Sequence, residues 1–369
     1  MKIKNYAFLL LISFILISAC KKTDRGLKAP EINLSVADKT INAGINQTIT
    51  IEASDKNTAT RNKPTFDQEW QLNGVVVSNT SVFSYKIPKS GTYLVIYKAS
   101  NEGGAFIREY TIHVDPVVVP ITANSNAYVT NFFEFSPAAG QFVNKAPGDE
   151  ASAKGLLGKK GLVSLGAFGG YVVYGFDHTV INQANADDLM IYGNAFAGFS
   201  EPGVVWVMQD ENGNGKPDDT WYELAGSEFG KPGYVRNYSV TYYRPVAPTL
   251  SVSWKDNNGL TGVVKQSFHK QAHYPLWITA DQFTLTGTLL PSTGITGASR
   301  SNELGTGYAD NKPAGDRMDI ANAIDKDGKK VSLQGIDFIK VQTGIMADLT
   351  VFGELSTEVS GIADLSLIK

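Results

Sequence analysis

The sequence predicts an all-β protein made of two β-sandwiches, a small one followed by a larger one. Apolar residues alternate with polar ones in short runs bounded by turn residues, and no long stretch repeats them with the period of a helix. The chain also contains 36 glycines, 11% aromatic and only 19% charged residues, which suits strands joined by many turns. Its 369 residues are enough for about two or three domains, each with its own core.

Two whole-chain counts exclude classes of partner and site. The formal net charge is -3, so there is no basic field to hold a nucleic-acid backbone, and we expect no nucleic-acid partner. The chain has a single cysteine, Cys20, which excludes an intramolecular disulfide and a cysteine-rich metal site.

The N-terminus carries the pattern of an export signal. Residues 1–19 begin with two lysines, continue as an apolar run over residues 7–17 and end in small residues before Cys20. A run this short predicts a secretory signal and not a membrane span. The stretch Ile-Ser-Ala-Cys at residues 17–20 resembles a bacterial lipobox, which would make Cys20 the lipidated first residue of the mature protein. The alternative is a cleaved signal followed by an incidental cysteine.

Lysines at positions 21 and 22 stand where an aspartate would favour retention in the inner membrane. We therefore expect a lipid-anchored protein of the outer membrane, exposed at the cell surface, with residues 20–29 as a polar tether.

A small sandwich is predicted over residues 30–116. Turn residues, notably the Asn73-Gly74 pair, separate its runs at the spacing of a β-sandwich. Trp70 and Tyr93 look like the core tryptophan and corner tyrosine of immunoglobulin-like and PKD-type domains, a resemblance that implies a spacer role. The predicted strands cover residues 32–34, 48–52, 69–72, 82–87, 92–98 and 106–114.

The larger domain is predicted over residues 121–369, after a Pro-bounded linker. Many strands without helical crossovers indicate an antiparallel sandwich. The set of runs looks like a discoidin-type, galactose-binding-like jelly roll, with another antiparallel sandwich as the alternative. The best short helix candidate is 316–324. The predicted strand regions cover residues 166–178, 188–194, 204–208, 221–224, 238–243, 283–286, 337–342 and 350–354.

A metal loop is predicted between the strands at 204–208 and 221–224. Ca²⁺ takes about 6–8 oxygen ligands, and a tight glycine turn lets alternate short side chains converge on it. An EF-hand would need Glu at position 12, where this chain has Trp221, so we predict a structural calcium loop of another kind. Counted from its first ligand, the loop places Asp210, Asn212 and Asn214 at positions 1, 3 and 5, Gly215 at 6, Lys216 with its carbonyl at 7, and Asp218 and Asp219 at 9 and 10.

The remaining carboxylate of this loop would come from Asp219, from Glu223 or from a more distant residue. The alternative to an ion is a solvated hairpin of Asx turns.

The segment 250–280 is expected to be an insertion that carries binding residues, because it interrupts the strand rhythm with aromatic and histidine side chains. Its candidate ligand contacts are Trp254, His269, His273, Tyr274 and Trp277. The alternative is that these side chains pack the insertion onto the sandwich. His269 and His273 have i, i+4 spacing, but position 270 is Lys, so the zinc-protease pattern is absent.

Further candidates stand at predicted strand ends and rim loops. His178, Asn194 and Glu201 are expected at the ligand site, with hydrogen bonding at a strand end as the alternative for His178 and metal binding as the alternative for Glu201. A second polar segment holds Tyr308, Asp310, Asp316 and Asp319, for which helix capping or a second ion site is the alternative to ligand contact.

Several blocks resemble one family more specifically. They are FEFSPAAGQFVN at 133–144, YGNAF at 192–196, SEPG at 200–203, FHKQAHYPLWI at 268–278 and GELSTEV at 353–359. With the metal loop, they are similar to Bacteroidota cell-surface lipoproteins that accompany outer-membrane vitamin B12 transport. The resemblance implies capture of a cobamide (cobalamin) and an outer-membrane B12 transporter as partner.

Two other functions are kept as alternatives. Discoidin-like folds often bind sugars, so a glycan-binding lipoprotein of a polysaccharide-use system is the second. A surface hydrolase is the third, although the sequence has no GxSxG elbow, no Walker A loop and no GxGxxG after a strand. We therefore expect a binding protein and not an enzyme.

Overall fold

The computed structural model describes residues 28–56, 65–265, 269–291, 301–349 and 353–368. The expected signal peptide and Cys20 lie outside these residues, as does the start of the predicted run 350–354. No helix in the described part of the chain is long and apolar enough to cross a membrane. By Cα packing the chain divides into two compact units, the second of which contains His113–Lys369.

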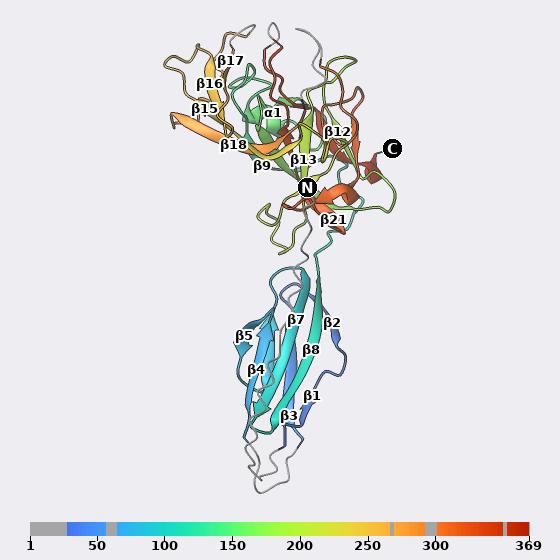
Figure 1. The fold of residues 1–369 in the computed structure, drawn as a ribbon. Coiled ribbons are helices and arrows are strands. Elements are labelled where there is room, and N and C mark those ends of the chain that lie inside the picture. Colours follow the sequence, from blue (N-terminus) through green and yellow to red (C-terminus); the bar gives the residue numbers. More distant parts are fainter. Residues whose placement is uncertain (1–27, 57–64, 266–268, 292–300, 350–352, 369) are drawn as a thin grey trace, which may run out of the picture. The chain divides into compact units, whose positions relative to one another are not determined.

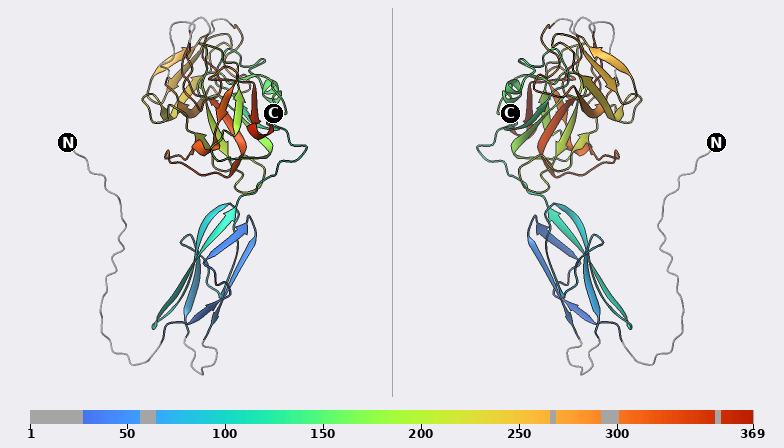
Figure 2. Two further views of the ribbon diagram at one scale, coloured as in Figure 1. Left: turned by 90° about the vertical axis from the view of Figure 1, so that its right-hand side faces the viewer. Right: turned by 90° about the vertical axis from the view of Figure 1, so that its left-hand side faces the viewer.

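The N-terminal sandwich consists of a three-stranded and a five-stranded sheet, which face each other in Figure 2. The strand orders are β1-β3-β6 and β2-β8-β7-β4-β5. Asn73 and Gly74 have φ of 47° and 82° and turn β4 into β5, as the Asn-Gly pair predicts. The strands are β1 (Ile32–Leu34), β2 (Thr40–Gly44), β3 (Thr48–Asp55), β4 (Asp67–Leu72), β5 (Val75–Ser78), β6 (Val82–Lys86), β7 (Gly91–Asn101) and β8 (Gly104–Asp115).

Trp70 is the centre of this sandwich, as predicted. It is fully buried, with its ring centroid 4.6 Å from that of Tyr97 and 5.5 Å from that of Phe83. Tyr93, the predicted corner tyrosine, is partly buried on β7. The fully buried Tyr110 on β8 donates its hydroxyl to the carbonyl of Val36, 2.9 Å away.

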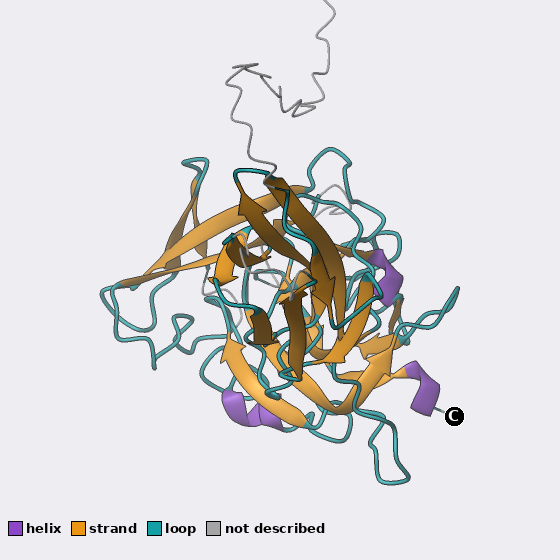
Figure 3. Ribbon diagram, turned by 90° about the horizontal axis from the view of Figure 1, so that it is seen from below, coloured by secondary structure: helices purple, strands orange, loops and turns teal. Residues whose placement is uncertain are grey.

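The larger unit confirms the all-β prediction, with helix confined to short pieces in its described residues (Figure 3). Its elements are β9 (Asn131–Ser136), α1 (Glu150–Lys154), β10 (Val163–Ser164), β11 (Tyr171–Ile181), β12 (Leu189–Tyr192), β13 (Gly203–Met208), β14 (Tyr222–Leu224), β15 (Val235–Tyr243), β16 (Val252–Asp256), β17 (Thr261–Val264), β18 (Gln282–Leu289), β19 (Asp316–Met318), η1 (Ile320–Asn322), β20 (Ala323–Ile324), β21 (Gly335–Thr343), β22 (Glu358–Val359), β23 (Gly361–Asp364) and η2 (Leu365–Leu367).

A six-stranded antiparallel sheet of order β20-β14-β13-β21-β11-β9 forms the middle of the larger unit. Alternate residues of its strands, such as Val172, Val205 and Val341, share one core with Leu189 and Ile362 of the β19-β12-β23 sheet. These two sheets therefore make the predicted sandwich, because period-2 alternation turns one face of each toward the other.

A four-stranded sheet of order β17-β16-β15-β18 contacts the opposite face of the six-stranded sheet through β18, and its strands are gathered at one side of the unit in Figure 1. Gln342 of β21 donates to the carbonyl of Thr286 in β18, and Thr288 donates to Glu223 of β14. The start of the predicted insertion 250–280 is a β-hairpin, formed by the antiparallel pair β16 and β17. Asp256 closes its turn by accepting from the backbone N–H groups of Asn258 and Leu260.

The helix expected over 316–324 is wrong. Residues 316–318 pair with β12 as β19, and Asp319 caps a single 3₁₀ turn by accepting from the N–H of Ala321. Cross-strand pairing and the cap satisfy the backbone hydrogen-bonding groups of these residues, so no helix is needed to do so.

Candidate functional site

The predicted metal loop joins β13 to β14, which pair with each other through Trp206 and Glu223. Asp210 organises the loop from within. Its Oδ1 accepts from the N–H groups of Gly213 and Asn214 at 2.8 and 3.1 Å, and its Oδ2 accepts from that of Gly215 at 2.7 Å. Both glycines have φ near 70°, a conformation that side chains rarely adopt, and this permits the tight turn.

The loop's side chains are of the types that bind a hard cation. In this structure, however, the side-chain N–H groups of Asn212 and Asn214 donate to the carboxylate of Asp218, at 3.0 Å each. Their amide oxygens accept from the backbone N–H groups of Asn214 and Lys216, as in the Asx turns that the sequence offered as the alternative. The hydrogen bonds to Asp218 lower its pKa, as a bound cation also would. Asp219 lies beside them and accepts from the N–H of Glu211, whereas Glu223 turns toward Thr288 and is not a loop ligand. Oxygen ligands alone are what Ca²⁺ takes.

A separate cavity of about 270 Å³ lies in the larger unit. Its walls are aromatic and aliphatic, and its remaining lining is polar or acidic. The residues that line it are Gln141, Phe142, Asn194, Phe199, Glu201, His269, Leu349, Gly353, Glu354, Leu355 and Glu358.

Two pairs of rings, one tilted and one stacked, form walls of the cavity. The Phe142 and His269 rings lie 4.9 Å apart, and Phe199 stacks on the exposed Phe196 with centroids 5.1 Å apart and planes within 4°. The segment that carries His269 is tied to the segment that carries Phe142, because Asn144 accepts from the N–H of Leu276 and donates to the carbonyl of Ala272. The walls are thus pre-positioned by hydrogen bonds between the Asn144 side chain and the backbone.

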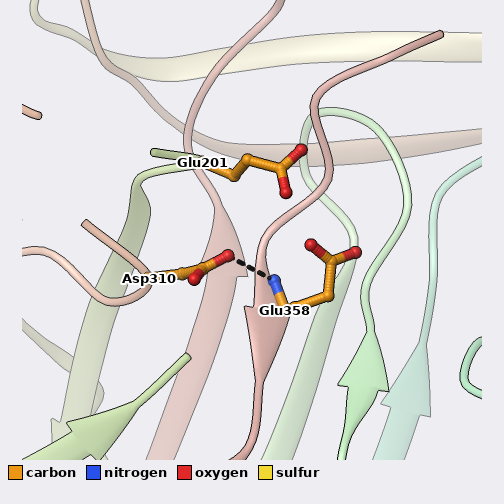
Figure 4. Close-up of side chains that lie close together, drawn as sticks. All are labelled: Glu201, Asp310 and Glu358. Carbon is orange, nitrogen blue, oxygen red and sulfur yellow. Dashed lines mark hydrogen bonds between the residues drawn. The ribbon is translucent and has the colours of Figure 1, made fainter. Parts of the chain in front are cut away.

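Two acidic residues of the cavity lining, Glu201 and Glu358, lie beside Asp310, which does not line the cavity itself. Glu201, Asp310 and Glu358 each offer an oxygen, and these oxygens lie within 4.8 Å of one another (Figure 4). Asp310 is held by backbone N–H groups, from Asn194 and Ala195 on Oδ1 and from Glu358 on Oδ2, all at 2.9 Å. We call Glu201, Asp310 and Glu358 the acidic cluster.

A close approach of backbone to side chain makes this geometry possible. A Cβ at Gly193 would lie 2.2 Å from Oδ1 of Asp310, so a larger residue there would displace the aspartate. Ser356 completes the cluster by donating its N–H to Glu201 and its hydroxyl to Glu358.

Burial and mutual repulsion disfavour negative charge here. Burial, followed by the charge of Glu358, raises the pKa of both Glu201 and Asp310 well above their ordinary values. Burial also raises the pKa of Glu354 to about 8. Glu354 borders a second, smaller cavity that Trp254 lines.

The structure brings some of the predicted ligand residues together. Asn194, Glu201 and His269 line one cavity, and Trp254 lines the neighbouring one. Trp277 is half exposed on the segment after His269, with its ring 6.4 Å from that of Phe135.

His273 and Tyr274, by contrast, are buried and line neither cavity. Tyr274 packs in the core beneath the four-stranded sheet and donates its hydroxyl to the carbonyl of Ala280. The alternative from the sequence, packing of this segment onto the sandwich, therefore holds for these two residues.

Sequence reasoning did not select Phe142, Phe199, Glu354 or Glu358 as site residues. Three of them stand in blocks that carry the family resemblance, Phe142 in 133–144 and both glutamates in 353–359. Their presence in these blocks was a signal that they could belong to the site. Nothing local in the sequence, however, placed these side chains at one cavity.

His178 lies away from this cavity, buried between two carboxylates. Its Nδ1 is 2.7 Å from Asp177 and its Nε2 is 2.9 Å from Asp364. Both ring nitrogens can donate only when the imidazole is charged. Burial opposes that charge, but hydrogen bonds and attraction from Asp364 and Asp177 outweigh it and raise the pKa of His178. The charge of His178 in turn partly offsets the burial that raises the pKa of Asp337.

We expect a His178→Gln substitution to lower the free energy of unfolding by about 1.5–3 kcal/mol below pH ~6.5, the pKa of an unfolded histidine. Because the folded pKa is raised, this contribution is fully present below that pH and is lost as pH rises through the folded value. Denaturation of both proteins from pH 5.5 to 9 measures the difference. A difference that stays constant with pH would show that the histidine is neutral throughout.

Comparisons with known proteins are sparse. No family model and no curated protein matches the chain. Among solved structures, the PKD domain of human KIAA0319 is 13% identical, with 28% of this chain and 99% of that one covered and a TM-score of 0.21. Carbohydrate-binding modules of the β-sandwich superfamily are 14% identical, with 92% and 99% covered and a TM-score of 0.20. A mixed-linkage glucan-binding surface protein of Bacteroides ovatus, SGBP-B, is 10% identical, with 94% and 98% covered and a TM-score of 0.19. With TM-scores this low, these likenesses decide neither the fold nor the function of the chain.

Proposed function

We propose that this chain is a lipid-anchored surface protein that captures cobamides and passes them to an outer-membrane transporter, without covalent chemistry. The observation that carries the proposal is the cavity, where aromatic walls, an imidazole and an amide from distant parts of the chain meet. The proposal also rests on the family resemblance of the sequence blocks, two of which supply its lining residues Phe142 and Asn194.

The chemistry of the ligand matches these walls. A corrinoid is a flat, amphipathic disc edged with amides, so it needs apolar contact together with hydrogen-bonding groups. Phe142 and Phe199 offer the first, and Asn194 the second. The imidazole of His269 is of the type that coordinates cobalt. A cavity of about 270 Å³ admits only part of such a ligand, so the rest would lie over the rim at Phe196.

Anchoring would make capture effective. A binding protein held by lipid beside a transporter raises the local concentration of its ligand without any new contact. The N-terminal sandwich would act as the spacer between the anchor and the larger unit.

A glycan is the second candidate ligand. The half-exposed Trp277 and the exposed Phe196 are flat apolar surfaces of the kind that stack on sugar rings, and carboxylates lie nearby. A glycan would leave the visible spectrum of the solution unchanged, whereas a cobamide coordinated by His269 would shift its absorption.

We expect Phe142→Ala and His269→Ala each to weaken retention of cyanocobalamin by about 10- to 30-fold, because each removes a central wall of the cavity. Co-elution of the coloured ligand on gel filtration, at several ligand concentrations, measures this. Phe229→Ala is the matched control, since its ring is exposed and does not line the cavity. Equal retention by all four proteins would move the ligand to another surface, and no retention by any would favour the glycan.

A further inference from the structure

The acidic cluster holds more negative charge than its surroundings compensate. Glu201, Asp310 and Glu358 are all buried, and among the described residues none of them forms an ion pair with a Lys, Arg or His side chain. Burying ionised carboxylates is costly unless they are paired, protonated or bound to a metal. The cluster therefore needs either shared protons or a cation.

The hydrogen bonds around the cluster favour a cation. Three backbone N–H groups donate to Asp310, and the N–H and hydroxyl of Ser356 donate to the two glutamates. Glu201 and Glu358 also lie within hydrogen-bond reach of each other, so without a cation they would share a proton. Donors of this kind stabilise the ionised form of a carboxylate. If all three groups are to be ionised despite their burial, they require positive charge between them.

The spacing of the oxygens suits such an ion. Ligands on opposite sides of Ca²⁺ stand roughly 4.6–5.2 Å apart, because each Ca–O distance is roughly 2.3–2.6 Å. The three carboxylate oxygens lie within 4.8 Å of one another, so all of them can reach one ion (Figure 4).

A second, independent observation points to a ligand at the same place. Glu354 is 5% exposed and lines the cavity together with Glu201 and Glu358. Its Oε1 accepts from the N–H of Gln141, but its Oε2 has no hydrogen-bond partner among the described residues. A buried carboxylate oxygen without a partner is rare, and a cation or its bound water would supply one.

We propose that Glu201, Asp310 and Glu358 bind one divalent cation at the edge of the cavity, with Glu354 reaching the same ion through water. The ligand set is entirely oxygen, which selects a hard cation such as Ca²⁺. The site is distinct from the 210–219 loop and does not depend on what the cavity captures. Its open side faces the cavity, where water or an oxygen of the captured molecule completes the coordination.

The test counts bound calcium by mass spectrometry in the chain from Lys21 onward, after equilibration with Ca²⁺ and removal of free ion. A Glu201→Gln/Glu358→Gln variant is expected to hold one ion fewer per chain than the parent. A loop variant, Asp210→Asn/Asp218→Asn, is expected to retain the cluster ion. Glu223→Gln is the matched control, because Glu223 is an equally buried glutamate outside the cluster.

An unchanged calcium count in the glutamine variant would overturn the proposal in favour of shared protons. Thermal unfolding gives a second signature. In chelator the glutamine variant is expected to melt higher than the parent, since it lacks the repulsion, and in Ca²⁺ it is expected to melt lower. If the glutamine variant does not fold, the calcium count of the loop variant tests the proposal by itself. One bound ion in the loop variant supports the cluster site, and no bound ion in the loop variant overturns the proposal.

Discussion

A Trp70→Ala substitution is expected to lower the free energy of unfolding of the N-terminal sandwich by about 3–5 kcal/mol, the range measured when large aromatic side chains are deleted from cores. The ring is fully buried between Tyr97 and Phe83, with centroids 4.6 and 5.5 Å away, and both neighbours belong to other strands. Deleting it leaves a cavity that the two facing sheets cannot close without moving closer together and disturbing the packing around it.

Hydrogen exchange at the backbone amides of β4 and β7 measures this loss separately from the larger unit. Val75→Ala is the control, because Val75 is exposed on the edge strand β5 and should cost little. If the sandwich is a spacer, Trp70→Ala leaves ligand binding by the larger unit unchanged. A loss below about 1 kcal/mol would contradict the central packing role of Trp70.

Removal of calcium from the 210–219 loop is the second large effect that we expect. An ion that binds only the folded chain stabilises it by about 4 kcal/mol when its free concentration is 1,000 times its Kd. Chelator should therefore lower the melting temperature, and Ca²⁺ should restore it. Asp210→Ala should lower it in both conditions and abolish the response, because the substitution also removes the acceptor of three backbone N–H groups.

This measurement is best made with Glu201→Gln/Glu358→Gln already present, so that the proposed cluster ion does not contribute. The control is Asp149→Asn, which alters the N-cap of α1, outside both the loop and the acidic cluster. An identical melting temperature with chelator and with Ca²⁺ in that background would count against an exchangeable ion in the loop.

Much of the fold could be predicted because local pattern determines it. Alternation of apolar residues located most strands, and the Asn73-Gly74 pair gave the hairpin between β4 and β5. The error at 316–324 shows the limit of such patterns. These residues form an edge strand and a capped turn because β12 offers them hydrogen bonds, and nothing local in the sequence shows that partner.

The candidate site was harder to predict for the same reason. The metal loop is one continuous stretch, so its donors could be read in order. The acidic cluster joins Glu201, Asp310 and Glu358 across more than a hundred residues, and only the sheet register brings them together. Residues that are close in the sequence also differ in burial, which the sequence did not show. Tyr274 faces the core, whereas Trp277, three residues later, is half exposed.

Calorimetric titration of the chain from Lys21 onward with cyanocobalamin, in calcium buffer, tests the central proposal most directly. Capture predicts one binding event of nanomolar to micromolar strength, weakened by His269→Ala and Phe142→Ala. No heat, together with no retention of the coloured ligand on gel filtration, would contradict cobamide capture and direct the search for a ligand to glycans.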